Sequence, residues 1–169
     1  MSLHKQFGTD KKAEVDGVWF SYPQPDGSTV DLKLARAGGA NTPYQRELRR
    51  ILRMFARAGD IPIEQFPPAR DEVCEAMATH ILKGWRTRQA NGDTIDKIEH
   101  ADGELRSYTP ELAKELLLGL PDLRNDIYTK ATDYRNFQDL DVEELEGNSS
   151  PASNGASGSA SKTRKPAAE

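Results

Sequence analysis

The sequence predicts an α+β protein: an N-terminal β-hairpin packed on a mainly α-helical body of about four helices, followed by a disordered C-terminal tail. Three observations carry this prediction. Apolar and polar residues alternate on both sides of a turn between residues 18 and 34, as in paired strands. From residue 42 to residue 137, apolar residues recur at helical spacing. After residue 147, no apolar residue is larger than Ala or Pro, so this part has little to bury.

We divide the 169 residues into a flexible leader over residues 1–12, a single domain over residues 13–147 and a disordered tail over residues 148–169. The net charge of -4 is unevenly placed, because the tail carries +2 and the remainder therefore carries -6. An acidic body argues against general binding to nucleic acid, which depends on neutralising phosphates. The tail is either a solvated terminus or a tether that reaches a second partner.

The hairpin is marked by the turn sequence PQPDGS, in which proline fixes φ and glycine permits a positive φ. Trp19 interrupts the alternation of the first strand, which suggests that both faces of that strand are covered. The alternating apolar residues are Val18, Phe20 and Tyr22 before the turn, and Val30, Leu32 and Leu34 after it.

Four helices are expected after the hairpin. The first spans residues 42–58, with an apolar stripe from Tyr44 to Phe55, and the second spans about residues 69–88, with Trp85 on its apolar face. A third begins behind a capping Thr109 and is interrupted at the sequence GLP, after which the last one begins. The polar stretch over residues 90–108 is a loop or a short ribbon.

No constellation for catalysis or metal binding is visible. Cys74 is the sole cysteine, which excludes an internal disulfide and fits a reducing cytoplasm, and the three histidines are too scattered for a zinc site. The chain has no phosphate-binding glycine loop and no evident pair of carboxylates for acid–base work. It also has neither a long apolar run nor an apolar N-terminal segment typical of secretion. We therefore expect no enzyme activity, no cofactor, no metal and no membrane association.

Two features are candidates for contact with other proteins. Trp19 and Trp85 are each either an anchor of the core or, where exposed, a hot spot for a partner. Leu118 and Leu120 point in directions different from the leucines before them, so the sequence LLLGLP is either a bend between packed helices or an apolar ledge.

The helix over residues 42–58 is rich in arginine and contains a single acid, Glu47. Its arginines form a solvated polar face, a contact with another protein, or a surface for nucleic acid. An acidic run after residue 138 favours protein contact over nucleic acid, because opposite patches on one molecule promote head-to-tail self-association. Self-association is expected to pair Arg46, Arg50 and Arg53 on the helix of one molecule with Asp141, Glu143 and Glu144 in the acidic run of another.

The order of these elements carries a resemblance over residues 15–149. It consists of the ribbon VWFSY…DGSTVDLKLARAGG, then ILKGW, a loop with DGE, the helix start YTPELAKELL, the segment DYRNF and an acidic stretch that closes on EGNSS. In this order they resemble the tail assembly chaperones of long-tailed bacteriophages.

The resemblance implies a non-enzymatic protein that binds the long helical tape measure protein and keeps it soluble. It further implies recruitment of tail tube protein, many copies or a homo-oligomer on each client, a location in the host cytoplasm and absence from the mature virion. In many relatives, a ribosomal frameshift near the end of the reading frame adds a C-terminal domain. The alternative is a small phage DNA-binding or packaging-associated protein that uses the arginine-rich helix over residues 42–58.

Overall fold

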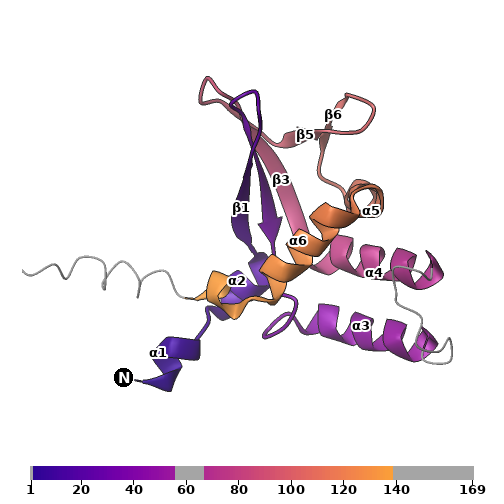
Figure 1. Cartoon of the computed structure of the whole chain (residues 1–169). Helices are drawn as coiled ribbons and strands as arrows, with labels where there is room; N and C mark the ends of the chain where they lie inside the picture. Colours follow the sequence, from indigo (N-terminus) through magenta and orange to yellow (C-terminus); the bar gives the residue numbers. More distant parts are fainter. Residues whose placement is uncertain (1, 56–66, 139–169) are drawn as a thin grey trace, which may run out of the picture. The chain divides into compact units, whose positions relative to one another are not determined.

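The computed structural model of the chain describes residues 2–55 and 67–138. The chain divides into two units, Met1–Asp139 and Leu140–Glu169, and every described element lies in the first (Figure 1). The elements are α1 (Leu3–Phe7), α2 (Lys11–Asp16), β1 (Val18–Pro23), β2 (Thr29–Leu34), α3 (Thr42–Phe55), α4 (Pro67–His80), β3 (Leu82–Arg88), β4 (Thr94–Ile95), β5 (Lys97–Glu99), β6 (Leu105–Ser107), α5 (Pro110–Gly119), α6 (Pro121–Thr132) and the 3₁₀ helix η2 (Tyr134–Phe137). The predicted α+β class is confirmed, while the tail over residues 148–169 lies outside the described residues.

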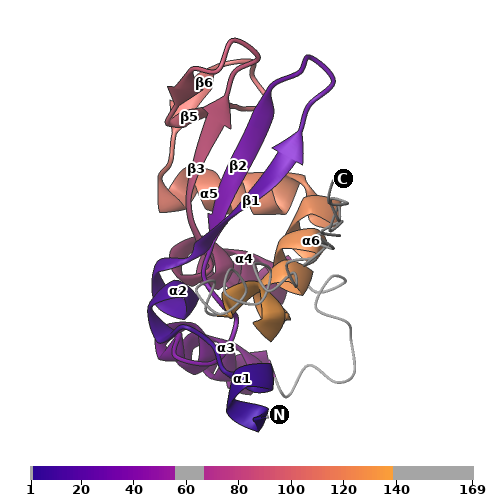
Figure 2. The ribbon, with the colours of Figure 1, turned by 90° about the vertical axis from the view of Figure 1, so that its left-hand side faces the viewer.

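The predicted hairpin is the first half of a four-stranded antiparallel sheet with the order β1-β2-β3-β4. Its turn forms as expected: the Gly27 amide donates to the Gln24 carbonyl, and Gly27 has the positive φ of +83° that glycine permits. A separate ribbon, β5–β6, occupies the stretch for which we considered a loop or a ribbon. Figure 2 shows β2 between β1 and β3, with β5 and β6 beyond β3.

The predicted helix over residues 69–88 is wrong in its second half. Helix α4 ends at His80, and residues 82–88 form β3, which pairs along the whole of β2. Helical periodicity does not distinguish a long helix from a helix followed at once by a strand. Gly84 favours the break, because glycine is a poor helix former, but pairing with β2 is a tertiary effect that overrides local propensity.

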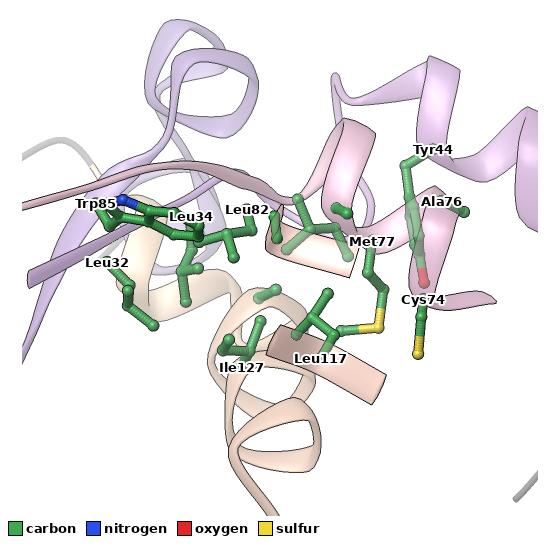
Figure 3. Close-up of a cluster of buried hydrophobic side chains, with 14 of the residues drawn as sticks. Leu32, Leu34, Tyr44, Cys74, Ala76, Met77, Leu82, Trp85, Leu117 and Ile127 are labelled. Carbon is green, nitrogen blue, oxygen red and sulfur yellow. The ribbon is translucent and has the colours of Figure 1, made fainter. Parts of the chain in front are cut away.

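One core joins the sheet to the helices. The inner face of the sheet contributes Leu32, Leu34 and Trp85, and these meet Met77 of α4 and the buried leucine and isoleucine of α5 and α6 (Figure 3). The indole Nε1 of Trp85 donates to the Arg106 carbonyl at 3.0 Å, so the core also fixes the β5–β6 ribbon. Tyr108 supports the same corner, because its hydroxyl oxygen lies 2.8 and 2.6 Å from the carbonyl oxygens of Ala78 and Leu82, which share its one hydrogen as acceptors.

The N-terminal segment is joined to the end of the described chain. Residues 3–7 of the predicted leader are helical, and the Asp10 amide donates to the Phe137 carbonyl at 2.8 Å. Next to it, the buried Glu14 carboxylate accepts from Thr9 Oγ1 at 2.6 Å and from the Ala40 amide at 2.5 Å, and it pairs with Arg36. Burial alone would raise the pKa of Glu14, but these hydrogen bonds outweigh it and lower that pKa.

Candidate protein-binding groove

A partly open hollow lies between α3, α4 and α6, and we call it the α3/α4/α6 groove. Its volume is about 240 Å³. The lining residues are Tyr44 and Leu48 from α3, Arg70, Val73 and Met77 from α4, and Arg124, Asn125 and Tyr128 from α6. The consecutive helices α3 and α4 thus contribute two sides of the groove, and α6, which lies much further along the chain, contributes the third.

The greater part of this lining is apolar. Tyr44 and Met77 are almost fully buried and form the floor, whereas Tyr128 is 45% exposed and so places the groove at the molecular surface. Burial, with the nearby Tyr128 as a second cause, raises the pKa of Tyr44 above its ordinary value, so this phenol stays neutral. Leu52 follows Leu48 by one helical turn and remains 49% exposed, which extends the apolar stripe of α3 beyond the groove.

Two arginines converge on this apolar lining. Arg124 is only 8% exposed, and among the described residues its side chain forms one hydrogen bond, a long one from Nη1 to Cys74 Sγ at 3.8 Å. The Nε of Arg70 is buried and has no hydrogen-bond partner in the part of the chain that the structure describes. Within the described residues, neither guanidinium forms an ion pair. A buried cation without an anion is costly, so this arrangement is unusual.

The carboxylates nearest in sequence to Arg70 are engaged elsewhere. Asp71 and Glu75 both accept from Lys114 Nζ of α5, at 2.7 and 3.0 Å. Glu72 accepts from Arg50 of α3 at 2.7 Å. These pairs tie α4 to its neighbours and leave the groove arginines without a carboxylate from α4.

The two tryptophans differ in position. Trp85 is 2% exposed and packs between Tyr108 and His100, with ring centroids 5.2 and 5.5 Å away, so it cannot serve as a partner contact on this fold. The reason is that Trp85 stands on β3 rather than on a helix, and its side of that strand faces the core. Trp19 is 41% exposed on the opposite face of the sheet, where the Arg86 guanidinium lies 4.2 Å from the ring centroid.

The sequence LLLGLP forms the bend between α5 and α6. Leu118 packs partly against the core, while Leu120 ends α5, precedes α6 and remains 48% exposed. Leu118 also borders a second hollow beside Phe55 and Pro68, whereas Leu120 borders neither of the two. The structure therefore does not bring the two leucines into one apolar ledge with the groove.

The arginine-rich helix is partly neutralised within the molecule. Arg50 donates to Glu47 at 2.5 Å and to Glu72 at 2.7 Å, so it is engaged in the described fold. Arg46 and Arg53 are exposed and form no ion pair with any described residue. Their proposed counterparts Asp141, Glu143 and Glu144 lie outside the described residues.

Sequence reasoning missed the two groove arginines, although a signal was present. Arg70 precedes Val73 by three positions and Met77 by seven, and Arg124 precedes Ile127 and Ala131 by the same intervals. Both arginines therefore occupy the apolar stripe of their helix rather than its solvent face. A charge in that register predicts a buried or lining guanidinium.

No group of three or more His, Cys, Asp or Glu side chains that could hold a metal ion occurs in residues 2–55 and 67–138. Within those same residues, no helix combines the length and the apolar character that crossing a bilayer requires.

Together, the antiparallel sheet, the shared core and the lined groove define a small α+β domain with a partly open groove between three of its helices. The chain belongs to the YdaY prophage protein family, whose model matches residues 39–148. It is therefore of phage origin. No curated protein and no solved structure matches it. The matched span contains all eight residues of the α3/α4/α6 groove but excludes Trp19 and the hairpin.

Proposed function

We propose that this phage protein is a tail assembly chaperone, which binds and solubilises the tape measure protein and helps to recruit tail tube subunits. The observation that carries the proposal is the partly open, mostly apolar groove between α3, α4 and α6, with Tyr128 and Leu52 exposed at the surface. Recognition of an amphipathic helix by an apolar groove is a common mode of protein binding. The resemblance in the order of elements indicates which helical client such a groove serves.

The charge of the molecule fits this activity. A net charge of -4 favours solubility of a client that is coated by many copies. The protein would act in the host cytoplasm, without a cofactor or a catalytic step, and would be absent from the mature virion. Its effect would therefore be stoichiometric, because each copy covers only a short length of helix.

Co-expression with the tape measure protein of the same prophage tests the proposal. The client should move from the insoluble to the soluble fraction in proportion to the ratio of chaperone to client. Leu52→Glu should reduce this effect, because it places a charge on the apolar stripe that leads from the groove. Val15→Glu is the matched control, since Val15 is 41% exposed but lies on α2.

A client that stays insoluble at every ratio would contradict the proposal. The alternative is a DNA-binding or packaging-associated phage protein, for which the exposed Arg46 and Arg53 on α3 are the favouring observation. That alternative requires retention on heparin and DNA binding that weakens steeply with salt. If the Leu52→Glu and Val15→Glu variants solubilise the client equally well, the chaperone function would stand, but the client would bind a surface other than the stripe of α3.

A further inference from the structure

The α3/α4/α6 groove contains two arginines for which the described residues supply no carboxylate. Arg124 is 92% buried, Arg70 has a buried Nε without a hydrogen-bond partner, and no described carboxylate pairs with either. The other arginines near buried positions are matched: Arg36 pairs with Glu14, and Arg86 pairs with Asp31. Arg70 and Arg124 differ from these paired arginines, because both line the groove and neither has a carboxylate partner among the described residues.

We propose that the groove binds a segment of a protein partner in which a carboxylate side chain lies beside a bulky apolar one. Arg124 and Arg70 hold the carboxylate, because a guanidinium offers several N–H donors to its two oxygens. The floor formed by Tyr44 and Met77 takes the apolar side chain. This inference rests on the proposed function and specifies the chemistry of the client segment.

The size of the groove favours a peptide over a free small molecule. Its volume of about 240 Å³ is below the roughly 300–1,000 Å³ of sites that enclose small ligands. It suits one or two side chains that enter from a helix lying across the surface. On such a helix, residues three or four positions apart share one face, so an acid and a leucine one turn apart reach the arginines and the floor together.

The stability of the free protein provides the first test. If Arg124 is present for a partner, replacing it with an apolar side chain of similar length removes an unpaired buried charge. We expect Arg124→Met to melt at the same temperature as the wild type or a few degrees higher. A residue kept for the fold would instead give a lower melting temperature when replaced.

Peptide binding provides the second test. The probes are two fluorescein-labelled helical peptides of 20 residues, built from Leu, Ala and Lys, which differ only by Glu or Gln one turn before a Leu of the apolar stripe. Fluorescence anisotropy should show that the wild type binds the Glu peptide about tenfold or more tightly than the Gln peptide, as expected for charge-assisted hydrogen bonds. Arg124→Met and Arg70→Met should abolish this preference. Arg46→Met, which removes an exposed arginine of α3 outside the groove, should retain it.

Equal affinity of the wild type for the two peptides, including no binding of either, would overturn the inference. So would a fall in the melting temperature of Arg124→Met together with an unchanged preference, because that result assigns Arg124 to the fold alone. A dimer in sedimentation that Arg124→Met dissolves, while neither peptide binds, would overturn it in favour of a second copy as the occupant. The co-expression experiment tests the proposed function separately. If the client becomes soluble but the peptides show no Glu preference, the proposed function stands and the inferred carboxylate site is refuted. If the Glu peptide is preferred but the client stays insoluble, the carboxylate site stands and the tape measure protein is refuted as the client.

Discussion

Asp31 is the buried charge whose role in stability can be tested most directly. It lies at the centre of β2 and is 1% exposed. Its carboxylate accepts from Ser21 Oγ at 2.7 Å, from Arg86 Nε at 3.0 Å, and from Arg88 Nε and Nη2 at 2.7 and 2.9 Å. Since Ser21 belongs to β1 and both arginines to β3, this one side chain joins three strands.

The perturbation is Asp31→Asn, which keeps the shape and removes the charge. Removing one partner of a fully buried ion pair costs about 3–5 kcal/mol, because the other charge is left uncompensated. Here the arginine side chains are 32% and 46% exposed, so both can turn to water, and the cost is lower. We expect the free energy of unfolding to fall by about 2 kcal/mol at pH 7, in the range of hydrogen bonds to a charged group. For a unit of this size, that corresponds to a melting temperature lower by roughly 4–8 °C.

The effect should depend on pH in one direction. The hydrogen bonds from Arg88, and then those from Ser21 and Arg86, lower the pKa of Asp31 against the opposing effect of burial. A carboxyl with a lowered pKa in the folded state contributes its full stability above the unfolded pKa of about 3.9. That contribution is lost as the pH falls through the lower folded pKa. The difference between the wild type and the variant should therefore be full at pH 7 and shrink below about pH 4.

Urea unfolding at pH 7 and at several values between pH 4 and pH 2.5 measures both effects. Asp96→Asn is the control, because Asp96 is an exposed carboxylate between β4 and β5 whose side chain forms no hydrogen bond or ion pair within the described part of the chain. A loss below about 0.5 kcal/mol at pH 7, which is typical of a surface substitution, would refute the reasoning. A loss that stays constant down to pH 2.5 would refute the electrostatic part alone.

Three further predictions concern the core, the tail and self-association. Trp85→Ala should lower the free energy of unfolding by about 3–5 kcal/mol, the cost of emptying a buried aromatic site, whereas Trp19→Ala should cost less than about 1 kcal/mol; equal losses in urea unfolding would contradict the assigned burial. Removal of residues 148–169 should leave the thermal melt unchanged, since that composition has little to bury; a drop of several degrees would mean that the tail packs on the domain. Reversal of Arg46 and Arg53, two exposed arginines of α3 without an ion pair among the described residues, to Glu should weaken oligomers in sedimentation at low salt and matter less at high salt, because exposed pairs are screened; a wild type that is monomeric at every salt concentration would contradict the self-association hypothesis.

The parts of the fold that could be predicted are those with a local signal. The hairpin was predictable because its turn contains Pro and Gly at the necessary places, and the start of α5 because the Thr109 side chain accepts from the Leu112 amide at 3.2 Å. β3 was not predictable in this way. Its residues follow the helix without a turn signal, and they become a strand because β2 offers a partner more than forty residues away in sequence.

The candidate site was predictable only in part, for a related reason. The apolar stripe of α3 marks Tyr44 and Leu48 in the sequence, but no pattern states which helices face them. Arg70 and Arg124 carry a register signal within their own helices, and their meeting depends on how α4 and α6 are packed. Trp85 shows the opposite case, since a conspicuous residue on a supposed helix face proved to be the centre of a core.

The sheet order shows that the family-matched segment, residues 39–148, lacks one strand next to β3. β3 and β4 lie within residues 39–148, but the strand that pairs with the other edge of β3 is β2, which precedes this span. A chain reduced to residues 39–148 would present the backbone N–H and C=O groups of β3 without their neighbour, and Trp85 would lose Leu32, its partner across the strand pair. Such an edge aggregates or captures a strand from another molecule. The N-terminal hairpin therefore covers this edge of β3 within the chain and protects it from pairing with a strand of another molecule.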